Sequence, residues 1–257
     1  MILELDQGNT RGKWRLIRAN SVAVDEVEVV ARGVFAPGPW WLEAALPAAW
    51  MECAPQRVRV ANVAGRDVER AIAGRLQRDL GLVAEFAQVT AVCAGVRCAY
   101  AQVERLGVDR WLAVLAAYRR SPVPALVVDC GSAVTLDLLG YGGEHLGGYI
   151  VPGLGLMRRA LFSDTDAVKV VENFAPAMSL APGKNTQDAV NRGLPLMVLG
   201  AVDQALGFLQ EHGTATGAAA PRLLLTGGDG ALLASLSERP FVLLDDLVME
   251  GLALANP

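Results

Sequence analysis

A short pattern of residues occurs twice in this sequence, once near the start and once near the middle. In each copy an apolar segment ends in an aspartate, and a glycine follows two residues later: Asp6-Gln7-Gly8 and Asp129-Cys130-Gly131. A second apolar segment, a turn and a third extended segment then follow in both halves. The simplest fold for this repeated order is a duplicated α/β lobe, in which each copy forms its own sheet.

We therefore predict an α/β protein of two similar lobes around a central cleft, with residues 1–120 in the first lobe and residues 121–257 in the second. The segment Ser121-Pro122-Val123-Pro124 marks the boundary, because closely spaced prolines interrupt regular structure. The length of 257 residues suits two closely packed lobes, and the 53% share of hydrophobic residues supports a large core.

The spacing of apolar residues predicts strands and helices in both halves. Strands are expected at 2–6, 12–18, 21–30, 57–62 and 82–86, and then at 125–129, 133–139, 146–150, 222–226 and 241–244. Helices are expected at 40–51, 68–80 and 108–120, and then at 152–161, 186–210, 231–237 and 247–255. Each aspartate–glycine pattern thus follows the first strand of its half.

Composition and charge argue against several classes of function. The net charge is −4 and the basic residues are spread along the chain, which disfavours a nucleic-acid-binding surface. Four cysteines without a Cys-x-x-Cys pair, and only two histidines, disfavour a zinc site or a disulfide framework. The N-terminal segment lacks the features of a signal peptide, and no uninterrupted apolar run reaches the length of a membrane span. We therefore expect a cytoplasmic protein that binds neither nucleic acid nor membranes.

Both aspartate–glycine turns contain the residue types that phosphate binding requires. Glycine lets the backbone approach an anion without a Cβ in the way. The residues beyond it, Asn9 and Thr10 in the first turn and Ser132 in the second, can donate hydrogen bonds to phosphate oxygens. Asp6 and Asp129 can each hold a cation, as phosphoryl transfer needs. Aspartate and glycine are also ordinary hairpin residues, but their occurrence at matching places in both halves favours the functional interpretation.

A third glycine-rich turn, Thr226-Gly227-Gly228-Asp229, lies between an expected strand and an expected helix. Backbone N–H groups at the start of a helix suit the phosphates of a nucleotide, although a plain strand-to-helix connection can have the same residues. The sequence contains neither Gly-x-x-x-x-Gly-Lys-Ser/Thr nor the spaced glycines of a dinucleotide-binding domain. These two classes of nucleotide-binding protein are therefore excluded.

The segment from Leu106 to Trp111 contains the candidate catalytic residue. Asp109 is at the start of an expected helix, where it can accept a proton from a substrate hydroxyl or can simply cap the helix. Arg110 can pair with a carboxylate or a phosphate of a substrate. Tyr100 can supply a phenolic hydrogen bond or can pack on the surface.

Together these motifs resemble those of the superfamily of acetate and sugar kinases, heat-shock chaperones and actin. Within it, Gly107-Val108-Asp109-Arg110, His145-Leu146-Gly147-Gly148 and Asn185-Thr186 resemble type III pantothenate kinase, and the resemblance extends from residue 6 to residue 229. It implies duplicated actin-like lobes of the ribonuclease H type. It also implies transfer of phosphate from ATP to pantothenate, which gives 4′-phosphopantothenate in the first step of coenzyme A synthesis. The ions implied are Mg²⁺ and a monovalent cation, K⁺ or NH₄⁺.

The resemblance implies a role for each matching residue. ATP is expected to contact a continuous segment and one residue of the second turn: Asp6, Gln7, Gly8, Asn9, Thr10, Arg11, Gly12 and Lys13, and Ser132. Mg²⁺ is expected near Asp6, and the monovalent cation near Asp129. Pantothenate is expected to contact residues of three segments: Tyr100, Gly107, Val108, Asp109, Arg110 and Thr186. Asp109 is the implied proton acceptor, and a homodimer is implied because Thr186 in this family reaches the neighbouring subunit's site.

The sequence departs from the family pattern at two positions of the second turn. Ser132 stands where the family commonly has threonine and keeps the hydroxyl, and Cys130 stands where a small or aliphatic residue is more usual. Two alternatives remain open: a kinase of the same fold that acts on another hydroxyl, and a non-catalytic regulatory protein. The presence of Asp6, Asp109 and Asp129 argues against a protein that has lost catalysis.

Overall fold

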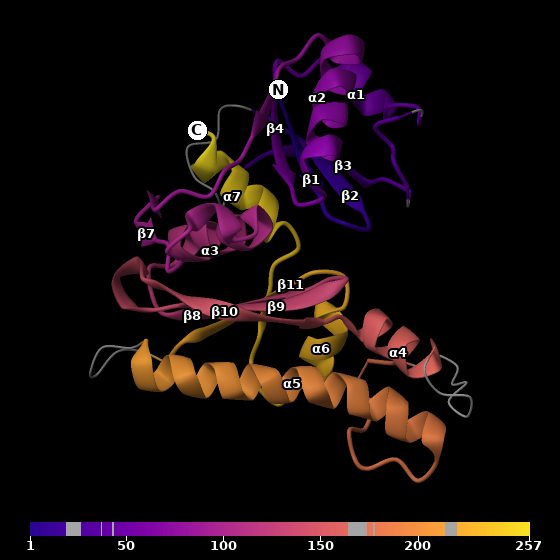
Figure 1. The fold of residues 1–257 in the computed structure, drawn as a ribbon, viewed down its shortest axis with the longest axis vertical. Helices are drawn as coiled ribbons and strands as arrows, with labels where there is room; N and C mark the ends of the chain where they lie inside the picture. The colour runs from indigo at the N-terminus through magenta and orange to yellow at the C-terminus, as the bar shows by residue number, and fades with distance from the viewer. Residues whose placement is uncertain (19–26, 37, 43, 164–173, 177, 214–219) are drawn as a thin grey trace. The chain divides into compact units, whose positions relative to one another are not determined.

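The computed structural model describes the chain apart from residues 19–26, 37, 43, 164–173, 177 and 214–219 (Figure 1). The chain divides into two compact units. The first comprises Met1–Ser121 together with Asp246–Pro257, and the second comprises Pro122–Asp245. The division thus falls after Ser121, one residue beyond the boundary expected from the sequence. Residues 246–257, which the sequence analysis assigned to the second lobe, group with the first unit instead.

The first unit is built on a five-stranded sheet with the order β3-β2-β1-β4-β5. Strands β1, β2 and β3 pair antiparallel, whereas β4 and β5 continue the sheet in the direction parallel to β1. The strands are β1 (Ile2–Gln7), β2 (Gly12–Ile17), β3 (Val29–Val34), β4 (Arg57–Asn62) and β5 (Ala84–Phe86). The helices are α1 (Ala48–Cys53), α2 (Arg66–Leu80), α3 (Val108–Arg120) and α7 (Leu247–Ala255), and β6 (Val92–Cys93), β7 (Val96–Arg97) and the 3-10 turn η2 (Val103–Arg105) precede α3.

The second unit repeats this topology with a sheet of order β10-β9-β8-β11-β12. Its first three strands again pair antiparallel, and its last two again run parallel to the central strand β8. The strands are β8 (Ala125–Cys130), β9 (Ala133–Leu139), β10 (His145–Pro152), β11 (Arg222–Thr226) and β12 (Val242–Leu243). The remaining elements are the 3-10 turn η3 (Tyr141–Gly143), α4 (Leu154–Ser163), α5 (Thr186–His212) and α6 (Gly230–Leu236). The predicted duplication of an α/β lobe is therefore confirmed strand by strand.

Each unit has its own hydrophobic core on the sheet. In the first unit α2 buries Ile72 and Leu76, which are four residues apart and therefore lie on the same face of the helix. In the second unit α5 (Figure 1) packs its buried residues into the core that strands β8 and β9 also line. Helix α2 ends at Gly81, which has φ +69°, the left-handed conformation that glycine adopts most easily.

Helix α5 is also the one described helix that is long and apolar enough to cross a membrane by length and composition. The core helix of a globular protein passes the same test. Leu194, Val198 and Val202 of α5 are buried in the core of the second unit. We therefore do not assign α5 as a membrane-spanning helix.

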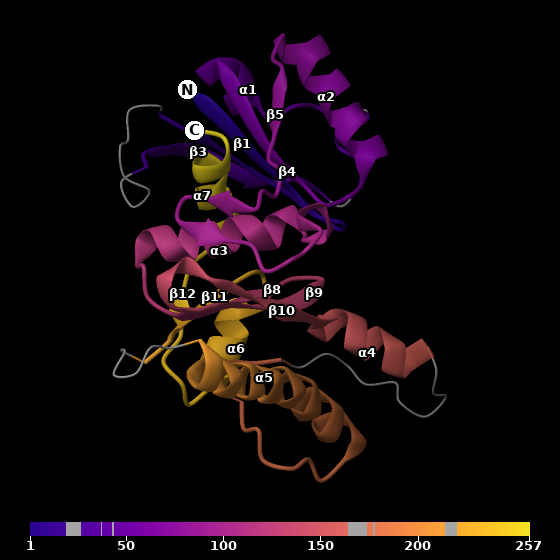
Figure 2. The same cartoon turned by 60° about the vertical axis from the view of Figure 1, so that its left-hand side comes forward.

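Helix α7 belongs to the first unit, where it lies beside α3 (Figure 2). A Cβ on Gly251 would lie 2.2 Å from the carbonyl oxygen of Leu112, so only glycine allows the two helices to cross this closely. Nearby, the Arg120 guanidinium donates to both carboxylate oxygens of Glu250, at 2.6 and 2.8 Å. The apolar pattern of α7 gives no indication of which sheet it covers, so the sequence could not assign it.

A buried ion-pair network lies in the sheet of the first unit. Glu4 is fully buried, and its two oxygens accept hydrogen bonds from Arg15 at 2.6 Å and from Arg59 at 3.2 Å. Asp246, directly before α7, lies 3.6 Å from Arg15 and 3.2 Å from Arg32. Removing one partner of such a buried network costs about 3–5 kcal/mol, because a charge is left without compensation. The network thus fixes both the strand register and the start of α7.

Two expected elements differ from those observed. The helix expected at 40–51 is wrong over most of its length, since α1 begins only at Ala48, after Pro47 at its N-cap. Before it, the carbonyls of Leu42 and Ala44 accept hydrogen bonds from the Arg75 guanidinium at 3.1 and 2.8 Å, so a side chain satisfies them. The strand expected at 21–30 lies mostly outside the described residues, and β3 begins at Val29.

Candidate active site

The first aspartate–glycine turn connects β1 to β2. Asp6 pairs across this hairpin with Lys13, and the Gly8 N–H donates to the Arg11 carbonyl at 3.0 Å, which closes the turn. Asn9 and Arg11 are exposed, whereas Asp6 is half-buried at the end of the central strand. The turn therefore exposes polar residues, with a half-buried carboxylate behind them.

Gln7 differs from its neighbours in this turn, because its side chain points into the protein. Its Oε1 accepts a hydrogen bond from the Trp40 indole at 2.8 Å, and its Nε2 donates to the Gly8 carbonyl at 2.7 Å. The side chain is only 4% exposed. Gln7 was expected to contact ATP, but in the structure its side chain is turned inward and supports the turn from behind.

The second aspartate–glycine turn, between β8 and β9, is also closed by the N–H of its glycine, but it is one residue shorter than the first. Asp129 pairs with Thr135, and the Gly131 N–H donates to the Ala133 carbonyl at 3.0 Å. Ser132 is exposed and Asp129 is half-buried, as their counterparts are in the first turn. The two copies of the sequence pattern thus form turns at corresponding places in the two units, each after the central strand of its sheet.

The structure brings the third glycine-rich turn against the second one. Strand β11 runs parallel to β8, with Thr226 level with Asp129. Gly227 has φ +88°, and a Cβ on it would lie 2.4 Å from Oδ1 of Asp129 and 2.5 Å from the Cys130 carbonyl oxygen. The Asp229 N–H donates to that same carbonyl at 3.0 Å. Two segments that are far apart in the sequence therefore form one surface of backbone groups and carboxylates.

Gly153 supports the second turn from another side, and the sequence analysis missed this role. Its N–H donates to the Ser132 carbonyl at 3.1 Å, and a Cβ on it would lie 2.4 Å from the Gly131 carbonyl oxygen. The available signal was Gly153 at the start of the helix expected at 152–161, since glycine permits close approach of another backbone segment.

Asp109 lies in the first turn of α3 and does not occupy its N-cap, which is Gly107. Its Oδ1 accepts the Arg110 backbone N–H at 2.7 Å, and the side chain is half-buried. A Cβ on Gly107 would lie 2.7 Å from this same oxygen, so the glycine leaves room for the carboxylate. The N-terminal end of a helix favours a negative charge, which suits a carboxylate in the first turn of α3.

Arg110 and Tyr100 lie together beside Asp109. The Arg110 guanidinium donates to the Tyr100 hydroxyl at 3.1 Å, and its central carbon is 5.9 Å from the centre of the Tyr100 ring. Arg110 is 5% exposed, so an anion that reaches it would bind with little competing water. The structure thus brings together four residues expected to contact the substrate: Tyr100, Gly107, Asp109 and Arg110.

Thr186 lies in the other unit, at the start of α5. Asn185 is the N-cap, and its side chain accepts the Asp188 N–H at 2.8 Å. Asn185 therefore caps α5. Thr186 is exposed at the first helical position, where its hydroxyl is accessible to a ligand.

Among the residues that the structure describes, no three histidine, cysteine, aspartate or glutamate side chains gather to hold a metal ion. Mg²⁺ that arrives with a nucleotide needs fewer protein ligands, because it takes one or two carboxylates together with phosphate oxygens and water. Asp6 and Asp129, each half-buried at the end of a central strand, fit that requirement.

Cys130 in the second turn is a buried residue. Burial raises the pKa of its thiol far above the ordinary value of 9.0, and the negative charges of Asp129 and Asp229 act in the same direction. The nucleophilic and oxidisable form of cysteine is the thiolate. The thiol is therefore chemically inert near neutral pH, although it lies within a candidate binding turn.

Comparison with known structures defines the class of protein. A structure from Sinorhizobium meliloti described as a 2-dehydro-3-deoxygalactonokinase aligns with a TM-score of 0.55 at 14% identity, over 99% of this chain and 98% of that one. A structure from Campylobacter jejuni assigned to the Baf family of transcriptional activators aligns with a TM-score of 0.59 at 20% identity, over 98% and 95%. At these identities the likeness shows the fold alone: an α/β protein with the duplicated actin-like lobes of the sugar kinases.

Sequence comparison identifies the family within this class. The family model for type III pantothenate kinase matches residues 2–207. A type III pantothenate kinase from Chromohalobacter salexigens is 39% identical over 100% of this chain and 88% of its own length. This chain belongs to the type III pantothenate kinase family, as its motifs predicted.

Proposed function

We propose that this protein transfers the γ-phosphate of ATP to the hydroxyl group of pantothenate and so forms 4′-phosphopantothenate, the first step of coenzyme A biosynthesis. Membership of the type III pantothenate kinase family supports the reaction. The observation that carries the proposal is the group formed by Asp109, Arg110 and Tyr100 at the start of α3.

In the proposed mechanism Asp109 is the general base. Its carboxylate takes the proton of the pantothenate hydroxyl while the hydroxyl oxygen bonds to the γ-phosphorus, and the bond from that phosphorus to the β–γ bridging oxygen breaks to release ADP. Arg110 and Tyr100 bind and orient pantothenate, for which Arg110 offers a nearly buried guanidinium to the substrate carboxylate. Gly107 and Val108 line the same contact surface, and the glycine leaves the base accessible.

Phosphate binding is assigned to the two aspartate–glycine turns. In the first turn the exposed donors are Asn9, Thr10 and Arg11, Gly8 permits close approach of the backbone, and Lys13 supplies a positive charge. Gly12 is buried against Gln7 and Trp40 behind the turn. In the second turn Ser132 donates its hydroxyl. Mg²⁺, held near Asp6, would neutralise the charge of the transferring phosphate. Preorganised donors of this kind lower the barrier because they need no reorganisation during the reaction.

A monovalent cation, K⁺ or NH₄⁺, is proposed to bind near Asp129. Oδ1 of Asp129 and the Cys130 carbonyl oxygen both lie against Gly227, within 2.5 Å of where its Cβ would be, so two oxygen atoms are close together there. Titration of K⁺ into a sodium buffer should raise the rate of ADP formation. Equal rates in the two buffers would contradict a monovalent site.

A homodimer is proposed in which Thr186 of one subunit completes the pantothenate site of the other. Helix α5, which begins at Thr186, also carries large apolar side chains on its outer surface: Leu196 is 55% exposed and Met197 is 64% exposed. Apolar residues exposed together on one helix are typical of an interface between subunits. The protein is proposed to act in the cytoplasm, with pantothenate and ATP as its ligands and without nucleic acid or membrane partners.

A coupled assay for ADP release tests the reaction itself. We expect ADP formation that requires both pantothenate and Mg²⁺, together with a new phosphomonoester in the product. Pantothenate analogues that lack the terminal hydroxyl are the matched control and should give no turnover. Absence of turnover with pantothenate under any cation, alongside turnover with another alcohol, would reassign the substrate; absence with every alcohol would favour a non-catalytic protein.

A further inference from the structure

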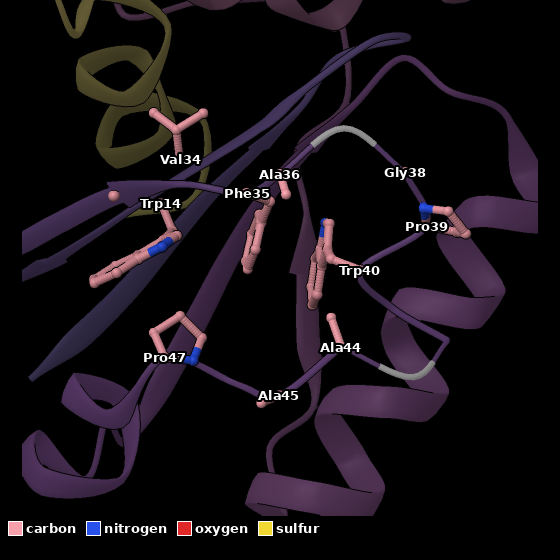
Figure 3. Close-up of a pocket in the computed structure, with 11 residues that line it drawn as sticks. Trp14, Val34, Phe35, Ala36, Gly38, Pro39, Trp40, Ala44, Ala45 and Pro47 are labelled. Atoms are coloured by element: carbon pink, nitrogen blue, oxygen red, sulfur yellow. The ribbon is translucent and has the colours of Figure 1, made fainter.

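Trp40 lies in the segment between β3 and α1, and its ring is almost completely buried in the first unit (Figure 3). The ring stacks on Phe35 with centroids 4.2 Å apart and planes inclined by 7°, and only 4% of the residue is exposed. One edge of the ring lines an open cavity of about 520 Å³. The indole Nε1 donates a hydrogen bond to Oε1 of Gln7 at 2.8 Å.

This hydrogen bond fixes the orientation of the Gln7 amide. An indole nitrogen can only donate, so the amide atom that faces it must be the oxygen. The amide nitrogen is therefore directed at the Gly8 carbonyl, to which it donates at 2.7 Å. Trp40, Gln7 and Gly8 thus form a chain of two hydrogen bonds that ends on the backbone of the first phosphate-binding turn.

Gly12 encloses this chain from the second strand of the hairpin. A Cβ on Gly12 would lie 2.6 Å from Oε1 of Gln7, 2.9 Å from Phe35 and 3.1 Å from Nε1 of Trp40. The Phe35 N–H also donates to the Gly12 carbonyl at 2.8 Å, which ties the aromatic segment to the hairpin. Because these groups surround the Gln7 amide, its side chain is restricted to this conformation.

The hydrogen bond from Gln7 to the Gly8 carbonyl also affects the next residue of the turn, because the peptide bond is planar. The carbonyl of Gly8 and the N–H of Asn9 belong to one peptide plane and point in opposite directions. Holding the Gly8 carbonyl toward Gln7 therefore also sets the direction of the Asn9 N–H. That N–H belongs to the segment assigned to the phosphates of ATP.

We propose that Trp40 is a positioning residue for ATP: its indole N–H, acting through Gln7, holds the Gly8–Asn9 peptide in the orientation that binds phosphate. The inference rests on the proposed function of the first turn. Without the indole donor, the Gln7 amide can rotate and the Gly8–Asn9 peptide can change its tilt, so part of the binding energy of ATP goes into ordering the turn.

The first experiment compares the variants Trp40→Phe and Trp50→Phe. Trp50 belongs to the same aromatic cluster, with its ring centroid 5.9 Å from that of Trp40, and it is fully buried. Its indole nitrogen makes no hydrogen bond to any residue that the structure describes. The two variants therefore lose the same atoms from the same core, but only one of them loses the bond to Gln7.

Binding of a non-hydrolysable ATP analogue with Mg²⁺, measured by isothermal titration calorimetry, separates the two variants. For Trp40→Phe we expect Kd to rise about 3- to 10-fold, the range for one lost hydrogen bond, and KM for ATP to rise with it while KM for pantothenate stays constant. For Trp50→Phe we expect Kd within about twofold of wild type, because this variant keeps the hydrogen bond from Trp40 to Gln7. Equal Kd values for the two variants would overturn the proposal.

A double-mutant cycle approaches the same contact from the other end. Gln7→Met removes both hydrogen bonds and keeps the side-chain length, so Trp40→Phe should weaken analogue binding no further in this background. Additive losses in the double variant would also overturn the proposal. Binding of the analogue can be measured without turnover. A wild-type protein that binds the analogue but does not phosphorylate pantothenate would contradict only the proposed substrate. A wild-type protein that does not bind the analogue would contradict both the assignment of the first turn to phosphate binding and the role of Trp40.

Discussion

Gly227 lies against the carboxylate of Asp129 so closely that a Cβ on the glycine would stand 2.4 Å from Oδ1. The same Cβ would stand 2.5 Å from the backbone carbonyl of Cys130, which cannot move without shifting β8. With φ of +88°, Gly227 also has a conformation that other residues adopt only under strain. The second and third glycine-rich turns therefore depend on each other for their shape.

Gly227→Ala should accordingly lower both stability and nucleotide affinity. We expect a loss of about 1–3 kcal/mol in the free energy of unfolding from strain and displacement, and weaker binding of an ATP analogue because Asp129 must move. Urea unfolding and calorimetric titration measure the two effects. Gly228→Ala is the matched control, since no atom lies within 4 Å of its Cβ position, and an equal loss in both variants would contradict the role of the Asp129 contact.

The repeated turns and most regular elements could be predicted because they depend on local sequence. Helix α3 has the predicted bounds, 108–120: Gly107 occupies its N-cap, and a proline follows Ser121. Strand β11 likewise has its predicted bounds, 222–226. In such segments the apolar pattern and the flanking glycine or proline agree, so tertiary contacts do not have to decide the structure.

What could not be predicted depends on contacts between distant residues. The assignment of α7 to the first unit is decided by the fit of Gly251 against Leu112, which no periodicity reveals. The contact between Tyr100 and Arg110 crosses an irregular segment with no repeating pattern. The bond between Gln7 and Trp40 joins residues 33 positions apart, so the sequence indicated neither the inward orientation of Gln7 nor the role of an aromatic residue in the phosphate turn.

The raised pKa of the Cys130 thiol predicts a particular pH dependence of stability. The folded protein keeps the thiol proton, whereas the unfolded chain loses it above its ordinary pKa of 9.0. The contribution of Cys130 is thus fully present below pH 9 and is lost as the pH rises beyond it. Relative to Cys130→Ala, the wild type should lose up to about 1.4 kcal/mol of unfolding free energy per pH unit above that point.

Urea unfolding of both proteins between pH 7 and pH 10.5 measures this difference. The values at pH 7 and pH 8 provide the baseline, because the thiol is protonated in both states there. A difference between wild type and variant that stays constant up to pH 10.5 would show that the thiol ionises as easily in the folded protein as in the unfolded chain.

The proposed role of Thr186 predicts complementation between two inactive variants. Asp109→Asn lacks the base and Thr186→Val lacks the hydroxyl offered to the neighbouring subunit. In a mixed dimer, one of the two sites would contain both an intact Asp109 and an intact Thr186. Co-expression with two different affinity tags yields mixed dimers, which should regain a substantial part of wild-type activity.

Homodimers of each variant, purified in the same way, are the control and should stay inactive. Inactive mixed dimers of verified composition would mean that each site is built within one chain. A monomeric wild type in sedimentation experiments would contradict the shared site directly, because Thr186 would then have no neighbouring subunit to serve.

The final prediction concerns Asp109 as the base. Asp109→Asn keeps an oxygen that can accept the Arg110 backbone N–H, which Asp109 accepts at 2.7 Å, so the start of α3 and the Tm should be nearly unchanged. The variant loses only the negative charge that receives the substrate proton. General-base assistance is worth about 10²–10⁴-fold, so kcat should fall by that order while KM for pantothenate changes much less.

Glu104→Gln is the matched control, because it makes the same chemical change at an exposed carboxylate in the neighbouring turn η2. Its kcat should remain near that of wild type. If Asp109 only stabilised the helix, Asp109→Asn would also keep a near-normal kcat, since asparagine accepts the same backbone hydrogen bond. Measuring kcat and Tm on one preparation of each variant distinguishes the two roles, because only the loss of a base lowers kcat while Tm stays near that of wild type.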